Sequence, residues 1–240
     1  MYKTLKEVTQ VAEDLNMTIG AFNAHNLEMM PEMIRAAKEM GSPIIIQTSI
    51  DTAKYIGYPV VVAVVKALAD NEMVDVVLHL DHAKDFDEIK TAIDAGYSSV
   101  MFDGSALPFK ENIAKTKAVV QYAHAKGVSV EGEIGTIGGT EEGISVPLDE
   151  KMYTKPEDAV QFVKETEVDA LAVAIGTSHG QFKSKTDVKI PLLRAIHEQV
   201  TIPLVVHGGT GVKEEDYPEL INNGIRKFNV GTELLVSWTQ

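Results

Sequence analysis

Short runs of apolar and β-branched residues recur along the chain, and polar residues follow each run. Eight of these runs predict strands, at residues 18–22, 43–48, 74–80, 99–102, 128–133, 170–175, 203–206 and 227–230. Helix-like patterns lie between them, at residues 28–41, 61–71, 85–96, 109–127, 155–167, 190–200 and 214–224. Several helix patterns end in glycine, which suits the positive φ of a helix C-cap.

The alternation of strands and helices predicts a parallel sheet that helices cover, because the strands are apolar almost throughout. Eight such units favour a (β/α)8 TIM barrel. An open, doubly wound sheet is the alternative, but no GxGxxG motif follows the first strand. No linker or low-complexity tract divides the chain, so we expect one barrel domain over residues 1–240.

The polar residues after the predicted strands point to an enzyme. They are Asn23, His25, Asn26, Gln47, Ser49, Asp81, His82, Asp103, Glu131, Glu133, Thr177, Ser178, His179, His207, Asn229 and Thr232. Barrel enzymes carry their catalytic groups at the C-terminal ends of the strands. A purely structural barrel has no reason to place polar groups at every strand end.

Composition narrows the function classes further. The chain has 240 residues, 45% of them hydrophobic, and a formal net charge of −13, so nucleic acid and anionic membranes are unfavourable partners. It has no cysteine, which excludes disulfides and thiolate chemistry and fits a cytoplasmic protein. No apolar run reaches membrane-spanning length.

Three histidines end predicted strands and form a candidate metal site. His82, His179 and His207 follow the third, sixth and seventh strands. Three imidazoles with one open position are typical of catalytic zinc, and imidazole also binds other divalent ions. Asp81 either orients a ligand or transfers a proton. Alternation along the strand turns Asp81 and His82 in different directions, which favours the second role. His79, within the same strand, is interpreted as a core histidine.

Glycine-rich segments after the last two strands predict a phosphate site. HGGTG (207–211) and NVGTE (229–233) lie where barrels often bind phosphate through backbone N–H groups. Lys183, in SHGQFK, is a candidate cation for the same phosphate. EIGTIGGTEEGISV (133–146) is interpreted as a mobile loop whose glutamates act as acid/base groups.

Six segments in this order closely resemble the class II, metal-dependent ketose-bisphosphate aldolases, over residues 21–233. The segments are LHLDHAKD, VMFDGS, VEGEIGTIGG, IGTSHGQFK, VVHGGTG and KFNVGTE. The resemblance implies reversible cleavage of fructose 1,6-bisphosphate to dihydroxyacetone phosphate and glyceraldehyde 3-phosphate, as in glycolysis. It also implies a homodimer or homotetramer in the cytoplasm.

The resemblance also implies roles for individual residues. His82, His179 and His207 would bind Zn²⁺ or another divalent metal, with Asp103 and Glu133 holding it in a second, more buried position. Asp81 would exchange a proton with the substrate oxygen, and Glu141 with the substrate carbon. The substrate site would comprise Asn23, Ser49, Gly180, Lys183, Gly208, Gly209, Thr210, Asn229, Val230, Gly231 and Thr232. A monovalent cation is implied near Gly180 and Gly208.

The implied chemistry suits a bound zinc ion, which would stabilise the enediolate left by aldol cleavage as a Lewis acid. A Schiff-base aldolase would need a buried lysine at a strand end. The end of the sixth strand, AVAIGTSHG, contains none.

Two features depart from the family pattern. Members of the family continue for several tens of residues beyond ELLVSWTQ, so we expect a truncated last helix. The arginine that binds the second phosphate is also missing, because Arg35, Arg194 and Arg226 all fall in or near helical segments.

Other functions remain open at this point. The substrate alternatives are tagatose 1,6-bisphosphate, a phosphorylated deoxy-keto acid and a ketose monophosphate. A non-catalytic sugar-phosphate-binding barrel and a metal-dependent epimerase are the other classes. The intact set of Asp81, Glu141 and three histidines favours an enzyme.

Overall fold

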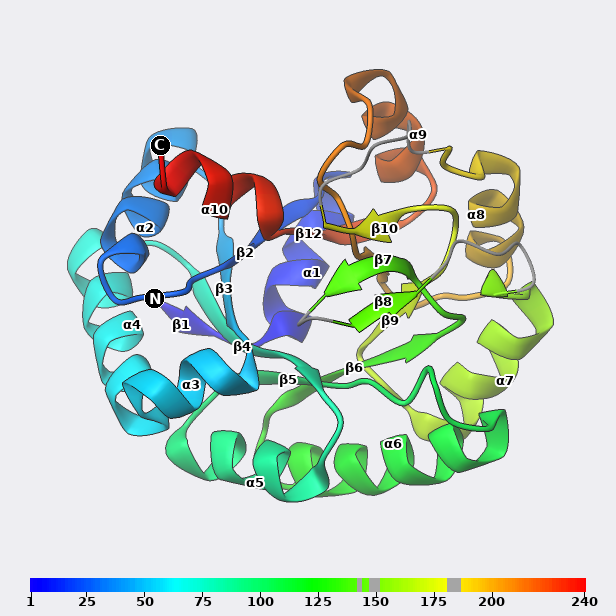
Figure 1. Cartoon of the computed structure of the whole chain (residues 1–240), viewed down its shortest axis with the longest axis horizontal. Coiled ribbons are helices and arrows are strands. Elements are labelled where there is room, and N and C mark those ends of the chain that lie inside the picture. Colours follow the sequence, from blue (N-terminus) through cyan, green and yellow to red (C-terminus); the bar gives the residue numbers. More distant parts are fainter. Residues whose placement is uncertain (142–143, 147–151, 181–186) are drawn as a thin grey trace.

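Eight parallel strands close into a barrel in the computed structural model, which describes residues 1–141, 144–146, 152–180 and 187–240 (Figure 1). Around the barrel the order is β4-β3-β2-β12-β11-β9-β6-β5, and β5 pairs with β4 to complete the ring. This confirms the (β/α)8 prediction. The strands are β2 (Ile19–Asn23), β3 (Ile44–Thr48), β4 (Val76–Ala83), β5 (Ser99–Phe102), β6 (Ser129–Ile134), β9 (Ala170–Val173), β11 (Leu204–Val206) and β12 (Ile225–Val230).

Each predicted strand has its counterpart, and the main difference lies at the end of β4. The apolar run predicts an end at Leu80, but β4 continues through Asp81 and His82 to Ala83. Its pairing with β5 shifts register between Leu80 and Ala83. This irregularity carries the polar residues into the strand and changes the directions of their side chains.

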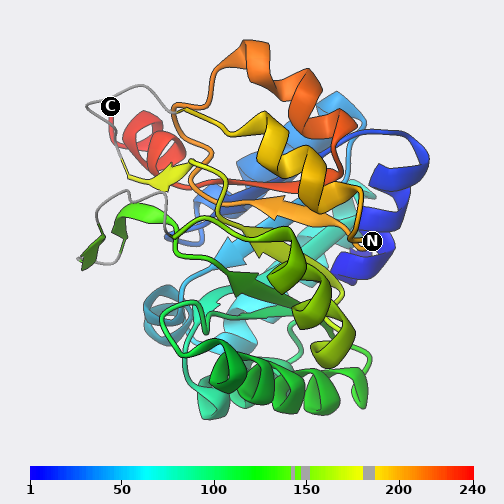
Figure 2. The same ribbon diagram turned by 90° about the vertical axis from the view of Figure 1, so that its right-hand side faces the viewer.

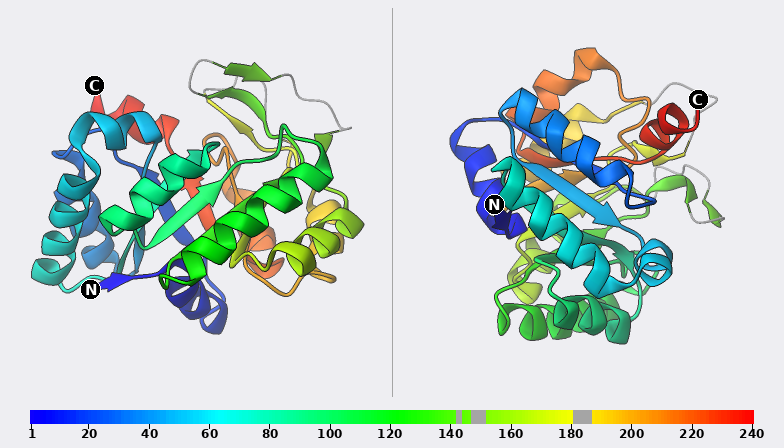
Figure 3. Two further views of the ribbon diagram at one scale, coloured as in Figure 1. Left: turned by 90° about the horizontal axis from the view of Figure 1, so that it is seen from below. Right: turned by 90° about the vertical axis from the view of Figure 1, so that its left-hand side faces the viewer.

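Helices surround the barrel (Figures 1 and 3). Helix α3 is N-capped by the Ser49 hydroxyl, which accepts a hydrogen bond from the Thr52 amide. Helix α4 begins with proline in its first turn, a favoured position. The helices are α1 (Leu5–Asp14), α2 (Met29–Met40), α3 (Ile50–Ile56), α4 (Tyr58–Glu72), α5 (Phe86–Ala95), α6 (Phe109–His124), α7 (Pro156–Thr166), α8 (Ile190–His197), α9 (Tyr217–Asn222) and α10 (Thr232–Trp238), with a 3-10 turn at Glu214–Asp216.

The apolar core has two layers, as expected for a barrel. The larger layer fills the space between the strands and the surrounding helices. The smaller layer lies inside the barrel and includes Ile19, Ile45, Val77 and Val205. Helix α1 adds Leu5, Val8 and Ala12 to this inner layer. It therefore closes the N-terminal end of the barrel, and a short strand, β1 (Tyr2–Lys3), precedes it and pairs with β4.

A small second sheet stands at the opposite end, where a mobile loop was predicted. Strands β7 (Gly138–Glu141) and β8 (Ile144–Val146) form an antiparallel pair, and β10 (Ser178–His179) lies parallel to β7. Figures 2 and 3 show this sheet and α1 at opposite ends of the molecule. The loop prediction is therefore wrong in part, because pairing with a segment distant in sequence orders the glycine-rich stretch as strand.

Across the described residues, no single helix is both long enough and apolar enough to cross a membrane. By length and composition alone, the pair α3 and α4 passes the same test, with a bend of 88° between them.

Candidate active site

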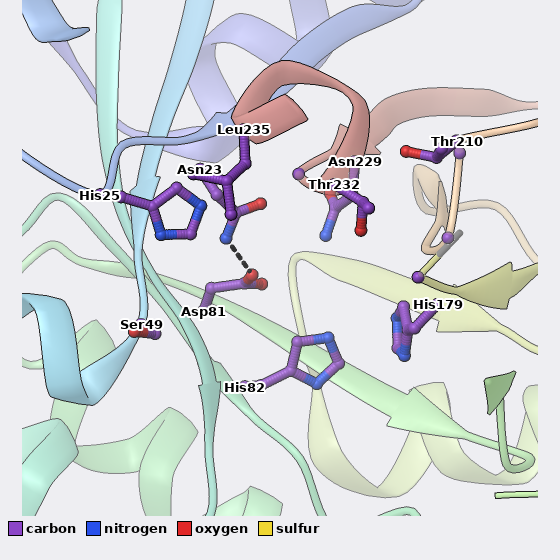
Figure 4. Close-up of a pocket in the computed structure, with 14 residues that line it drawn as sticks. Asn23, His25, Ser49, Asp81, His82, His179, Thr210, Asn229, Thr232 and Leu235 are labelled. Carbon is purple, nitrogen blue, oxygen red and sulfur yellow. Dashed lines mark hydrogen bonds between the residues drawn. The ribbon is translucent and has the colours of Figure 1, made fainter. Parts of the chain in front are cut away.

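A pocket opens at the C-terminal ends of the barrel strands (Figure 4). Most of its lining consists of residues that the sequence singled out. The lining residues are Asn23, His25, Ser49, Asp81, His82, His179, Gly180, Gly208, Gly209, Thr210, Asn229, Gly231, Thr232 and Leu235. Segments from both halves of the chain therefore meet in one cavity, as the barrel prediction requires.

The three predicted histidine ligands lie together: His82 and His179 line the pocket, and His207 is fully buried beside them. One ring nitrogen from each of His82, His179 and His207 lies within 4.8 Å of the others. The ring centroid of His82 lies 4.6 Å from that of His207 and 5.1 Å from that of His179. The nearest nitrogens are His207 Nδ1 and His82 Nε2, which are 2.7 Å apart. The predicted histidine cluster is thus present, although its three members are far apart in sequence.

Carboxylates hold the outer nitrogens of two of these rings. His207 Nε2 lies 2.7 Å from Glu131 Oε1, and His82 Nδ1 lies 3.4 Å from Asp103 Oδ2. Burial lowers the pKa of His207 well below its ordinary value, and the nearby charges of His82 and Lys227 add to this effect, so His207 is neutral. A proton or a cation must then lie between the facing nitrogens of His82 and His207. This donor set fits a divalent metal ion.

A second candidate metal group shares His82 with the first. Ligand atoms of His82, Asp103 and Glu133 lie within 4.8 Å of one another. Burial by itself raises the pKa of Asp103, but the hydrogen bond and charge of His82 and the hydrogen bonds from Ser105 outweigh it and hold this pKa well below its ordinary value. Asp103 is therefore an ionised oxygen donor. The arrangement places it and Glu133 beside the histidine cluster, where the resemblance implies a second metal position.

His82 has an unusual backbone conformation for a strand residue. Its φ is 50°, in the left-handed region that non-glycine residues rarely adopt. Strand alternation predicts different directions for Asp81 and His82, and their partners do differ: Asp81 contacts Asn23 and Gln47, and His82 contacts Asp103 and His207. Both residues nevertheless line the pocket, at the point where the positive φ and the register shift interrupt the regular strand. Such strain is often concentrated at functional sites.

Asp81 is a buried carboxylate with one oxygen held and one available. Its Oδ2 accepts hydrogen bonds from Asn23 Nδ2 at 2.9 Å and from Gln47 Nε2 at 3.2 Å. Its Oδ1 is buried and has no hydrogen-bond partner among the described residues. Burial raises the pKa of Asp81, but the charges of His82, Lys227 and His207 and the bond from Asn23 outweigh it, and the net pKa is lowered. The group is therefore ionised and able to accept a proton.

The two glycine-rich segments pack against each other at the pocket. Gly208 has φ 64°, and a Cβ atom there would lie 2.2 Å from the Ser178 carbonyl oxygen. A Cβ atom at Gly209 would lie 2.5 Å from the Asn229 carbonyl oxygen, which accepts the Gly209 N–H at 3.1 Å. Only glycine allows this close approach. The result is a backbone-lined wall of the pocket opposite Ser49 and His25 (Figure 4).

Some predicted residues lie elsewhere or outside the described part of the chain. Val230 lines a depression on the outer face of the barrel, beside Tyr217 and Phe228. Glu141 ends β7, and the structure describes its backbone only. Lys183 lies outside the described residues.

The three arginines are all engaged away from the pocket. Arg35 contacts Glu32 and Glu72, and Arg194 contacts Glu219. Arg226 contacts Glu13 and is the second residue of β12, so its placement near a helix is wrong.

Sequence reasoning missed how Glu131, Lys227 and Gln47 contribute. Each is fully buried and contacts a predicted site residue: Glu131 contacts His207, Lys227 contacts Asn229, and Gln47 contacts Asp81. Glu131 and Lys227 are two residues before Glu133 and Asn229 on their strands. Because side chains two apart in a strand share a face, this spacing was the available signal.

Comparisons with known proteins agree with this geometry. The sequence model described as "Fructose-bisphosphate aldolase class-II" matches residues 3–240. A 6-phospho-5-dehydro-2-deoxy-D-gluconate aldolase from Shouchella clausii is 43% identical over 224 residues, which cover 92% of this chain and 75% of that protein. A fructose-bisphosphate aldolase from Geobacillus stearothermophilus is 40% identical over 240 residues, which cover 99% of this chain and 83% of that protein. The crystal structure of a putative fructose-1,6-biphosphate aldolase from Coccidioides immitis superposes with a TM-score of 0.91 at 30% identity. The superposition covers 99% of this chain and 84% of that chain.

Proposed function

This chain belongs to the class II fructose-bisphosphate aldolase family, and we propose that it uses a divalent metal, zinc by preference, to cleave fructose 1,6-bisphosphate reversibly. The products would be dihydroxyacetone phosphate and glyceraldehyde 3-phosphate. One observation carries the proposal: Asp81, whose Oδ1 has no hydrogen-bond partner among the described residues, lines the same pocket as His82 and His179, and His207 lies buried beside these two histidines.

The metal ligands in this proposal are His82, His179 and His207. Imidazole nitrogens suit zinc, and the cluster leaves the pocket side for substrate. When bound, a divalent ion supplies Lewis-acid stabilisation of the negative charge that develops on the three-carbon product. Asp103 and Glu133 offer a second, deeper set of ligands that includes His82.

Asp81 is the proposed base. It would take the proton from the substrate hydroxyl next to the carbon–carbon bond that breaks, and return it during condensation. Asn23 and Gln47 hold the carboxylate in place through Oδ2, so the proton is transferred to Oδ1. Fixing an ionised base within reach of its proton is the usual requirement for efficient proton transfer.

The glycine-rich wall is the proposed phosphate anchor. Gly208, Gly209, Thr210 and Thr232 line one side of the pocket, and the proposed donors are the Gly208 N–H and the two threonine hydroxyls, since the Gly209 N–H already bonds the Asn229 carbonyl oxygen. Together with Asn229 and Gly231 they would bind the phosphate of the three-carbon half, with Lys183 as an added cation. A monovalent cation near Gly180 and Gly208 belongs to the same proposal.

The opposite side of the pocket would receive the aldehyde half. His25 and Ser49 lie there, away from the glycine-rich wall (Figure 4). Burial lowers the pKa of His25, so its imidazole is neutral and available for hydrogen bonding. Glu141, carried by β7 next to β10, is proposed to exchange the proton on the substrate carbon.

A phosphorylated deoxy-keto acid is the second candidate substrate. The relative from Shouchella clausii, an aldolase for 6-phospho-5-dehydro-2-deoxy-D-gluconate, is 43% identical. That identity is similar to the 40% shared with the fructose-bisphosphate aldolase from Geobacillus stearothermophilus. The two substrates differ in the half that we place beside His25 and Ser49.

A substrate panel with and without chelator tests the proposal. We expect the highest kcat/KM on fructose 1,6-bisphosphate, with tagatose 1,6-bisphosphate and the deoxy-keto acid phosphate as comparison substrates. Activity should disappear in chelator and return with zinc. A higher kcat/KM on the keto acid would replace the substrate assignment, and borohydride trapping of substrate on the protein would contradict the metal mechanism.

A further inference from the structure

A buried ion pair lies inside the barrel, beneath the histidine cluster. Lys227 Nζ, on β12, is 2.9 Å from Glu131 Oε2, on β6, and both side chains are 0% exposed. Taking two charges out of water is costly, and apolar residues of similar size often stabilise a core as well or better. The inner layer next to this pair consists of alanine, valine, isoleucine and leucine. Apolar residues could therefore fill this position as well, and the fold alone does not require an ion pair here.

The two partners also contact residues of the proposed active site. Glu131 Oε1 lies 2.7 Å from His207 Nε2, so the carboxylate accepts a hydrogen bond from the N–H at that position. Lys227 Nζ donates a hydrogen bond of 2.8 Å to Asn229 Oδ1, and Asn229 lines the pocket. One ion pair thus connects a proposed metal ligand to a proposed substrate-binding residue.

The contact with Glu131 determines which nitrogen of His207 is available. A neutral imidazole carries one proton, and a carboxylate at Nε2 keeps the proton there. The lone pair then lies on Nδ1, which faces His82 Nε2 at 2.7 Å. In metal sites, a carboxylate on the far nitrogen of a histidine fixes the tautomer and raises the basicity of the ligand.

We propose that Lys227 and Glu131 are positioning residues, which hold His207 in the Nε2–H tautomer and fix its Nδ1 toward the metal. Lys227 compensates the charge of Glu131, orients its carboxylate and holds the amide of Asn229. The inference rests on the proposed metal function. It adds two residues, distant from the pocket surface, on which the affinity for the metal depends.

Variants that remove one or both charges separate positioning from stability. Glu131→Gln and Lys227→Met each leave a buried charge without its partner, so each should lower the free energy of unfolding measured in urea. The double variant removes both charges and should recover much of that stability. Its zinc affinity, measured by competition with a chromophoric chelator, should stay about 10- to 100-fold weaker than wild type. The glutamine amide of Glu131→Gln accepts the hydrogen bond from His207 Nε2–H more weakly than a carboxylate does. It can also turn its own N–H toward Nε2, which would favour the Nδ1–H tautomer of His207.

A second ion pair on the same strand provides a matched control. Arg226, next to Lys227 on β12, contacts Glu13 on α1, the helix that closes the N-terminal end of the barrel. The double variant Arg226→Met, Glu13→Gln should leave zinc affinity within about twofold of wild type. Equal loss of affinity in both double variants would mean that the effect is a general consequence of charge removal, and would overturn the proposal.

The tautomer can be observed without any variant of the ion pair. Imidazole ¹⁵N spectra of the metal-free wild-type protein should show His207 protonated at Nε2, with its signals assigned by their loss in His207→Gln. Protonation at Nδ1 would overturn the inference, as would wild-type zinc affinity in the Glu131–Lys227 double variant. If wild-type protein binds no zinc at all, the proposed function fails instead, which is a distinguishable result.

Discussion

Asn23 donates a hydrogen bond to only one oxygen of Asp81, and this leaves the other oxygen for chemistry. The bond runs from Asn23 Nδ2 to Asp81 Oδ2 at 2.9 Å, whereas Oδ1 has no hydrogen-bond partner among the described residues. A buried carboxylate oxygen without a partner is unfavourable unless it has a role.

Replacing Asp81 by Asn or Ala should lower kcat by about two to four orders of magnitude, the contribution typical of a general base. The amide of Asn cannot accept the hydroxyl proton, although it keeps the shape of the side chain. Zinc content, measured by atomic absorption, should stay at the wild-type level in both variants. Loss of the metal in Asp81→Asn would mean that Asp81 is a ligand and not the base.

Metal binding should depend on His179, the most accessible member of the cluster. In wild-type protein, free zinc at about 100 times its Kd should stabilise the fold by about 2.7 kcal/mol, measured by thermal unfolding with and without zinc. His179→Gln should abolish most of this increase. The control is His124→Gln, a change on α6 beside Asp169 and far from the cluster, which should retain it. An equal zinc effect in all three proteins would exclude His179 as a ligand.

Gly208 should be intolerant of alanine for a reason beyond its backbone angle. Its φ of 64° is close to the 61° of Gly41, so both alanine variants bear similar backbone strain. A Cβ atom at Gly41 meets nothing within 4 Å, but one at Gly208 meets the Ser178 carbonyl oxygen at 2.2 Å. We expect Gly41→Ala to cost about 1 kcal/mol and to leave KM unchanged. Gly208→Ala should cost more and raise KM for phosphorylated substrates at least tenfold, since the wall must move. Similar KM values in both variants would argue against phosphate binding at this wall.

The metal-free protein should become less stable as the pH is lowered below the ordinary pKa of histidine. Burial, together with the charge of Lys227, lowers the pKa of His79 well below 6.5 in the folded protein. Below pH 6.5 the unfolded chain therefore binds a proton that the folded chain does not. For this residue, the unfolding free energy then decreases by up to about 1.4 kcal/mol per pH unit. Urea unfolding in chelator between pH 7.5 and 5.5 measures the slope, which should be shallower in His79→Asn. An unchanged slope would show that His79 does not titrate in this way.

The strands and the pocket could be predicted because simple patterns encode them. Apolar runs mark the barrel strands within a few residues, and the polar residues after them identify the histidine cluster. The glycines of HGGTG signal close backbone approach, and Gly208 and Gly209 are packed against carbonyl oxygens. These features depend on residue type and spacing, which a sequence displays directly.

Other features depend on contacts that spacing does not display. The positive φ of His82 occurs at a residue that is neither glycine nor asparagine, and the tertiary pairing of β4 imposes it. The contact of Lys227 with Glu131 joins strands separated by about a third of the ring and exists only because the barrel closes. Strand β7 pairs with β10, a segment distant in sequence, and the glycine-rich pattern does not display this pairing.

Helix α1 closes one end of the barrel with Leu5, Val8 and Ala12, while the pocket lies at the other end. Substrate and products would therefore enter and leave at the pocket end of the barrel, because α1 packs across the other end. A product bound at the glycine-rich wall would block the binding of new substrate there, whereas the product on the side of His25 and Ser49 would be released first. Release of the two products in a fixed order would make only the last one released a competitive inhibitor, which product-inhibition kinetics would test.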